Sequence, residues 1–518
     1  MVPQVSTGRS RRGRFLFNVI WGWAGVAVNV LSGIVLSPIL IRRLGVDQYG
    51  LWVLLFSLID YMRVLDFGFR AAVLNRCARC RARQDWEGVS RTLSTALAYF
   101  VGIAASVGLL VSLARGPIVR VMEISPAHAA DARILTVLIA ATVTLRLAVA
   151  PLIAALEAFE RFDVVNGIYI GALVFRASGS LAVILSGYGL VEMAVVVLLA
   201  QVGECLVTLG RVKQIVPHLT LNPRQSNYRT LTGLFHYGRY SALISTSDLV
   251  SLNAPTIALG YLRGAAEVGY FALPFRLLMY ITEAIEKVAG VTSSVSAALD
   301  ELGDKQKVFA LAVLTNRHCF ALFMPVAVYL LVYGVQLLRL WVTPDMAANG
   351  GRVLPILMIS FLFAVSAQNN AAAVLIGQSR HHVYAYGTIV EALSIIALLL
   401  FFVPAYGIIG AAWVVSSVVL GVRGVYVAAA FCWQNGFPFG HYIWSVYAPG
   451  LWTGALMTAV ALTLRATVWP GNHWAELIFA GAVLFSLYFA VAFFTVVDSE
   501  HRGHILNWGA LALKPKAN

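Results

Sequence analysis

The sequence predicts an all-α polytopic membrane protein that crosses the bilayer about 14 times. Of its 518 residues, 59% are hydrophobic and only 12% are charged. Apolar stretches of about 20 residues, the length that a helix needs to span a bilayer, recur along the whole chain. No class of soluble globular protein has this composition, so each stretch is interpreted as a transmembrane helix.

The expected spans follow one another with short connections. The apolar run behind the basic N-terminus is too long for a signal peptide and lacks a clear small-residue cleavage site, so we expect it to remain as the first helix. The spans are placed at 15–41, 50–74, 89–113, 132–156, 164–186, 189–210, 231–260, 268–299, 307–333, 352–376, 382–403, 407–432, 444–465 and 474–497.

The net charge of +14 is concentrated in the connections. Because the basic residues lie between apolar helices, we attribute them to membrane orientation and exclude nucleic acid as a partner. The connections on the N-terminal side carry 20 Lys and Arg residues, against 8 on the other side. This bias predicts that both termini are cytoplasmic.

The chain contains an internal repeat. LGVDQYGLWVL around Gly50 matches RGAAEVGYFAL around Gly269, and GYGLVEMAVVV around Gly189 matches AYGIIGAAWVV around Gly407. The offsets are 219 and 218 residues, which predicts two parallel six-helix halves with a site between them. The expected domains are 1–214 (helices 1–6), a cytoplasmic linker 215–229, 230–432 (helices 7–12), and 433–518 with the last two helices and a cytoplasmic tail.

Charged residues interrupt the second span. Asp60, Arg63, Asp66 and Arg70 fall within an arc of about 120° if 50–74 is one helix. A charge in hydrocarbon costs at least ~2.5–3.5 kcal/mol, so these side chains are expected to face a polar path or a partner. An Arg63–Asp66 ion pair is the structural alternative.

A second polar stripe lies on the first helix and is repeated on the seventh. Asn18 and Asn29 share one face, and adding 219 places Asp248 at the position of Asn29. We interpret Asn18 and Asn29 as cavity residues and Asp248 as a candidate for ion coupling. The alternative is interhelical packing by small and amide residues.

The eighth helix carries a third charged stripe. Arg276, Glu283 and Lys287 lie within about 60° of arc with Tyr280. Arg276 and Glu283 are seven residues apart and need not neutralise each other, whereas Glu283 and Lys287 are spaced for an i,i+4 ion pair. We take Arg63, Arg70, Arg276 and Lys287 as a ladder of positive charge suited to phosphate, with Asp66 and Glu283 as ion-coupling candidates.

Further ionisable residues occupy the other spans. His318 is a candidate for a proton relay, with a packing role as the alternative. Arg239 is added to the cavity candidates. The remaining intramembrane cations are Arg146, Arg176, Arg317 and Arg423, and their candidate partners are Glu192, Glu204 and Glu391.

Catalytic and metal motifs are missing from the sequence. There is no P-loop and no Ser/His/Asp or metal-ligand constellation, so neither ATP hydrolysis nor a catalytic residue is expected. Cys77 and Cys80 form a lone CxxC within RCARCRAR, which we assign to a solvated basic loop rather than to zinc. No cofactor is expected beyond an ion gradient of protons or sodium.

Several motifs recur in a fixed order along the chain: LGVDQYGLW (44–52), LDFGFRAAV (65–73), the stretch from Tyr237 through Asp248 to GAAEVGYFAL (264–273), and the Tyr-Gly starts at 188 and 406. Together with the 14 spans and the repeat, they resemble the polysaccharide transporter (Wzx-type flippase) branch of the MOP exporter superfamily. The resemblance implies two six-helix lobes in a V plus two C-terminal helices, with helices 1, 2, 7 and 8 lining a central cavity.

The resemblance also implies a function and a place. Such proteins move undecaprenyl-diphosphate-linked oligosaccharide from the cytoplasmic to the periplasmic leaflet of the bacterial inner membrane by alternating access, for O-antigen, capsule or exopolysaccharide. The polymerase and chain-length regulator of such a pathway are candidate partners. A lipid II flippase or an ion-coupled multidrug exporter of the same superfamily is the alternative, and a membrane-embedded glycosyltransferase or ligase is a third.

Overall fold

The computed structural model describes residues 11–61, 64, 68–121, 129–216, 219–497 and 502. Every regular element among them is a helix, and the chain forms two compact units. Unit 1 comprises residues 1–272 and 392–411, and unit 2 comprises residues 273–391 and 412–518. The predicted boundaries at 214, 229 and 432 stay a prediction.

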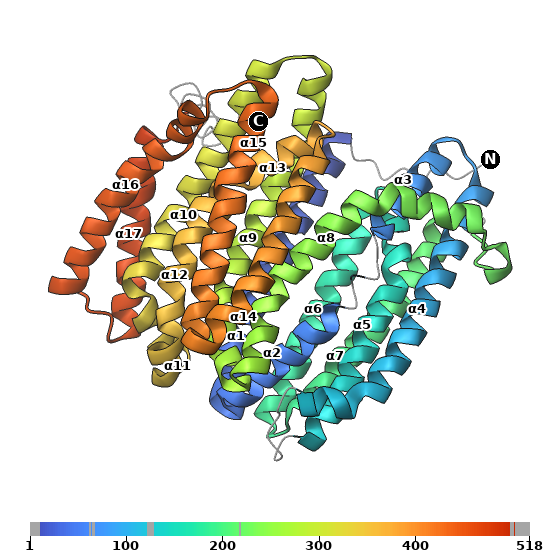
Figure 1. Cartoon of the computed structure of the whole chain (residues 1–518), viewed down its shortest axis with the longest axis horizontal. Coiled ribbons are helices and arrows are strands. Elements are labelled where there is room, and N and C mark those ends of the chain that lie inside the picture. The colour runs from blue at the N-terminus through green and yellow to red at the C-terminus, as the bar shows by residue number, and fades with distance from the viewer. Residues whose placement is uncertain are drawn as a thin grey trace, which may run out of the picture. The chain divides into compact units, whose positions relative to one another are not determined.

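Unit 1 contains the first eight α-helices and the beginning of the ninth. Within it, α3, α4 and α5 pack side by side (Figure 1). The helices are α1 (Arg11–Leu44), α2 (Val46–Asp60), α3 (Phe69–Ala82), α4 (Trp86–Val121), α5 (Ala129–Ala158), α6 (Phe162–Leu185), α7 (Leu190–Ile215) and α8 (Tyr228–Leu262), with the short helix η2 (Pro223–Gln225) before α8.

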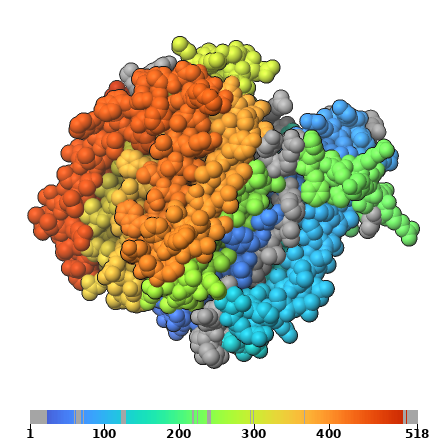
Figure 2. Space-filling model, in the orientation of Figure 1, coloured from blue at the N-terminus to red at the C-terminus, as the bar shows by residue number. Residues whose placement is uncertain are grey.

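Unit 2 begins within α9 (Ala265–Glu301). In Figures 1 and 2, α16 and α17 form one edge of this unit. Its helices are α10 (Lys305–Trp341), α11 (Pro344–Asn349), η3 (Gly350–Arg352), α12 (Val353–Ser360), η4 (Phe361–Ser366), α13 (Ala367–Gly377), α14 (His381–Val419, with 392–411 in unit 1), η5 (Leu420–Tyr426), α15 (Val427–Asn435), α16 (Phe439–Thr467) and α17 (Trp474–Thr495).

The helices confirm the predicted fold class. Eleven helical segments in the described part of the chain are long and apolar enough to cross a membrane. The stretch His381–Asn435 contains two of the predicted spans, which meet at a kink where Gly407 has φ 54°. The other two predicted spans correspond to α2 with α3 and to α8, so the structure is consistent with 14 crossings.

The second predicted span is not one helix. The structure ends α2 at Asp60 and begins α3 at Phe69, after Gly68 with φ 69°. A left-handed backbone does not continue an α-helix and is accessible mainly to glycine. The expectation that 50–74 forms one helix with four charges on one arc is therefore wrong.

The core of unit 1 surrounds the start of α3. The Phe69 ring stacks on Tyr99 of α4 at 4.5 Å between centroids and meets Phe100 and Phe235 edge-on. Phe69 and Phe100 are fully buried. Burial of such aromatic rings fixes the direction in which α3 leaves the break.

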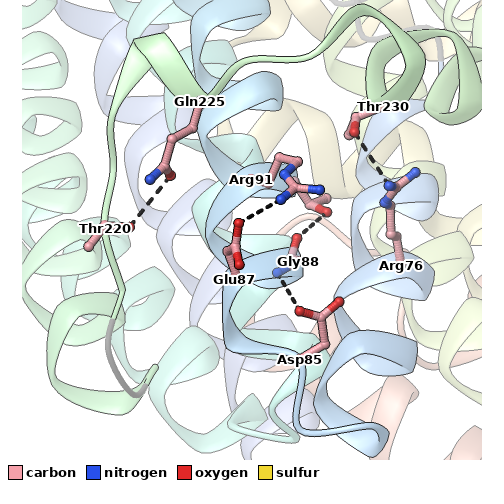
Figure 3. A network of polar contacts seen from close by, with 9 residues as sticks. Arg76, Asp85, Glu87, Gly88, Arg91, Thr220, Gln225 and Thr230 are labelled. Atoms are coloured by element: carbon pink, nitrogen blue, oxygen red, sulfur yellow. Dashed lines mark hydrogen bonds and ion pairs between the residues drawn. The ribbon is translucent and has the colours of Figure 1, made fainter.

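The linker before α8 is bonded to α4. The backbone N–H groups of Thr220, Asn222 and Asn227 donate to the hydroxyls of Ser90, Ser94 and Thr95, respectively, at 3.1–3.3 Å. Figure 3 shows the polar contacts around this region, including Arg76 of α3 donating to Thr230 of α8 at 3.4 Å. Hydrogen bonds thus attach the linker and the first residues of α8, where the second repeat begins, to α3 and α4 of the first repeat.

Candidate functional site

The break between α2 and α3 lies against α8. The hydroxyl of Tyr61 donates to the backbone carbonyl of Val250 at 3.3 Å. Two residues before Val250 is Asp248, which is half-buried. Ser251 is buried, and its hydroxyl has no hydrogen-bond partner among the described residues. Asp248 and the unsatisfied Ser251 hydroxyl thus lie on α8 within one turn of the point where the break contacts it, and polar groups beside an interrupted helix can bind an ion or a proton.

Of the other predicted cavity residues on α1, on α8 and in the break, the structure describes the side chain of Asn29. Asn29 is half-buried on α1, which packs against α6 through Gly25 and Tyr169. Arg63 and Asp66 lie outside the described residues. The side chains of Asn18 on α1 and of Arg239 on α8 also lie outside the described part, although their backbones are helical.

Arg70 has a partner that the sequence did not indicate. Its guanidinium forms an ion pair with Glu157 of α5 at 2.5 Å. The Arg70 side chain is 52% exposed and that of Glu157 only 9%. Arg70 therefore still presents a half-exposed cationic surface, while Glu157 neutralises part of its charge.

The cation on α9 is also paired. Arg276 lies 4.0 Å from Glu283 and places its guanidinium 5.0 Å from the centre of the Tyr280 ring. Seven residues bring two side chains onto the same helix face, and both are long enough to cover the rise between them. The structure thus forms a pair that the seven-residue spacing did not require. The side chain of Lys287 lies outside the described part, so the alternative pair remains a prediction.

His318 and Arg317 on α10 contact backbone carbonyls. Nδ1 of His318 lies 2.6 Å from the carbonyl oxygen of Leu314, one turn earlier. Nε of Arg317 donates to the carbonyl of Ser445 on α16 at 2.9 Å. These contacts fit the packing alternative for His318, and its role in a proton relay stays a prediction.

Glu391 is confirmed as the ion-pair partner of one intramembrane cation, Arg423. Arg423, on the π-helical segment η5, donates to both carboxylate oxygens of Glu391 on α14 at 2.8–3.1 Å. Glu391 is completely buried. In a π-helix such as η5 the hydrogen bonds run from residue i to i+5, and short π-helical segments of this kind are frequent at functional sites.

The other two predicted glutamates differ in role. Glu204 of α7 is close enough to Arg176 and Arg146 to interact with both charges. Glu192 instead accepts a hydrogen bond from the backbone N–H of Gly189 at 3.0 Å. It caps α7, so its assignment as a partner of an intramembrane cation is wrong.

A buried polar network in unit 2 was not predicted. Tyr442 accepts from Asn316 and donates to Gln368, both at 2.9 Å, and Gln368 donates to Tyr447 at 3.0 Å. All four side chains are buried. The network joins α10, α13 and α16, so the thirteenth predicted span is attached to the preceding helices by hydrogen bonds rather than by apolar packing alone.

The CxxC motif belongs to a helix and not to a solvated loop. Cys77 on α3 is fully buried. A fully buried thiol is out of reach of solvent. In the part of the chain that the structure describes, no group of three potential metal-ligating residues occurs.

The repeat places two equivalent glycines in contact within unit 1. A Cβ on Gly269 would lie 2.7 Å from the carbonyl oxygen of Val46 and 3.5 Å from the nitrogen of Gly50. A Cβ on Gly50 would collide with the carbonyl of Ala265. The beginnings of α2 and α9 thus approach backbone to backbone at the same position of each repeat.

Solved structures of membrane transporters share the helical fold described above. The chain superposes on the lipid II flippase MurJ in an inward closed conformation with a TM-score of 0.67 (13% identity; 92% of this chain, 99% of that chain). It superposes on an inward-facing MATE multidrug resistance transporter of the MOP superfamily with a TM-score of 0.62 (17% identity; 82% and 98%). The fold is that of the MOP superfamily.

The sequence comparisons identify the family. Residues 39–344 match the family model described as "Polysaccharide biosynthesis protein". The chain belongs to this family, which confirms the resemblance to polysaccharide transporters. It is also 23% identical over 397 residues to a Shigella flexneri protein named "Putative O-antigen transporter", covering 76% of this chain and 92% of that one.

Proposed function

We propose that this polysaccharide transporter is a flippase for undecaprenyl-diphosphate-linked oligosaccharide, moving it from the cytoplasmic to the periplasmic leaflet by alternating access. Family and fold are of the transporter type, and the relative's name points to O-antigen. The observation that carries the proposal for this chain is Arg276, which is 46% exposed within an apolar helix although Glu283 and Tyr280 are within reach. A half-exposed guanidinium is accessible to a diphosphate and matches its geometry through bidentate hydrogen bonds.

The deciding experiment measures lipid-linked glycan in each leaflet of a deletion strain. Accumulation of complete undecaprenyl-diphosphate oligosaccharide on the cytoplasmic side, with no surface polymer, is expected. Normal surface polymer together with lost drug resistance would favour a multidrug exporter. Accumulated lipid II would favour a lipid II flippase, and intermediates lacking a sugar would favour an enzyme.

The substrate-binding part of the proposal is tested with charge variants. Arg276→Ala should abolish export at unchanged membrane levels, because the diphosphate loses a charged donor inside the membrane. Arg63→Ala, at a position outside the described residues, is expected to do the same. Arg224→Ala in the exposed linker is the matched control and should export normally. Normal export from both variants would contradict a cationic diphosphate site.

We further propose that an ion gradient of protons or sodium drives transport through Asp248. The support is its place on α8 two residues before the contact of Val250 with Tyr61, with the unsatisfied Ser251 hydroxyl one turn further along. Asp248→Asn should impair export and flatten its dependence on pH or sodium, because an amide neither titrates nor neutralises a cation. An unchanged profile would remove Asp248 as a coupling residue.

A further inference from the structure

A groove between α6 and α7 in unit 1 has no role in the proposed transport cycle. It has a volume of about 760 Å³, and the described residues that line it belong to α6, to α7 and to the turn before α6. That volume falls in the range of small-molecule sites. The floor is open because Gly167, Gly171 and Gly203 have nothing within 4 Å of where a Cβ would be.

The walls of the groove are apolar and exposed. Phe175, Leu199 and Val207 line it and are 52%, 55% and 49% exposed. Side chains of this kind on a membrane helix contact lipid. Glu204 also lines the groove, with the positive charges of Arg176 and Arg146 within electrostatic reach.

One end of the groove is cationic. Arg161 and Arg211 lie there with Asp163, which accepts both bonds of a bidentate pair from Arg161 at 3.0 Å. Arg211 donates to Gln214 at 3.2 Å, an exposed neutral partner that a phosphate would replace. The rim therefore has a net positive charge. The Lys and Arg bias assigns this end to the cytoplasm.

The dimensions match one lipid in one leaflet. From Arg211 to Leu199 the helix rises about 18 Å, which is slightly more than half of a hydrocarbon core of ~30 Å. A chain entering from the rim would thus fill the groove over the depth of a leaflet. Basic pockets between transmembrane helices on the cytoplasmic side bind anionic lipid head groups.

We propose that this groove binds one anionic phospholipid of the cytoplasmic leaflet. The phosphate contacts Arg211 and Arg161, and one acyl chain lies over Gly203 and Gly171. None of its lining residues is among the substrate residues proposed on α8 and α9, and its proposal does not depend on the transported molecule.

The experiment measures thermal unfolding of the purified full chain in a neutral detergent with added dioleoyl phosphatidylglycerol. The lipid should raise the unfolding midpoint of the wild type. Arg211→Gln should need about tenfold more lipid, the cost of one charge-assisted hydrogen bond, and Gly203→Leu should abolish the response by filling the groove.

Matched variants on α7 provide the controls. Lys213→Gln and Gly210→Leu change exposed residues of the same types that do not line the groove, and both should respond like the wild type. An undiminished response of Gly203→Leu would overturn the proposal. So would equal stabilisation by dioleoyl phosphatidylcholine, which lacks the net charge, or by inorganic phosphate, which lacks the chain.

Discussion

At the scale of single residues, several intramembrane charges of this chain have ion-pair partners, on another helix for Arg70 and on the same helix for Arg276. The Arg70–Glu157 pair joins α3 to α5, and the Arg423–Glu391 pair joins η5 to α14, the helix that directly precedes it. In the second pair the carboxylate is completely buried. Breaking a buried pair by removing one member is costly, because the remaining charge has no compensation.

This argument predicts an asymmetric effect of mutations in the Arg423–Glu391 pair. Arg423→Met should destabilise the protein by ~3–5 kcal/mol, because it leaves the Glu391 carboxylate uncompensated. The double variant Arg423→Met/Glu391→Gln should recover most of that loss, since neither remaining side chain is charged. Thermal unfolding in detergent measures both. Equal destabilisation of the single and double variants would show that packing, not charge, dominates at this site.

At the scale of elements, the repeat brings α2 and α9 together at glycines. Gly269 leaves no room for a side chain next to Val46, so the contact depends on the absence of a Cβ. In a transporter that alternates between two states, a contact between equivalent repeat positions is suited to open and close.

We therefore expect Gly269→Ala to separate the beginnings of α2 and α9. In a Val46→Cys background, labelling by a membrane-impermeant maleimide should rise about threefold or more, because the carbonyl of Val46 has to move away from the new Cβ. Gly102→Ala, on an open face of α4, is the control and should leave labelling unchanged. Unchanged labelling in Gly269→Ala would mean that the helices accommodate the methyl group without separating.

The attachment of α16 gives a second test at this scale. Tyr442→Phe removes the hydroxyl that links Asn316 to Gln368 and should cost ~1–3 kcal/mol, because buried amide groups lose their partner. Tyr228→Phe alters a tyrosine that is 78% exposed and should be neutral. Unfolding midpoints compare the two. A stability change of the same size in both variants would argue against the network as the link.

At the scale of the whole molecule, the sequence predicts what depends on hydrophobic length and periodicity. Fold class, spans and family followed from apolar stretches and from repeated motifs around Gly50 and Gly269. The break at Gly68 was missed because a hydrophobic window does not detect a left-handed backbone. The Tyr442 network and the Arg70–Glu157 pair were missed because they join helices whose proximity the sequence does not encode locally.

The predicted orientation in the membrane, with both termini in the cytoplasm, also determines that the cationic rim of the α6–α7 groove faces the cytoplasm. Positive charge favours the cytoplasmic side, which places Leu302 before α10 inside the cell and Ala348 after α10 outside. In intact cells, an impermeant thiol reagent should label Ala348→Cys at once and Leu302→Cys only after permeabilisation; both positions are exposed. The unmutated protein is the control, because it shows how much of the labelling comes from the five native cysteines. The reverse pattern would place the rim of the α6–α7 groove in the outer leaflet and invert the direction of the proposed transport.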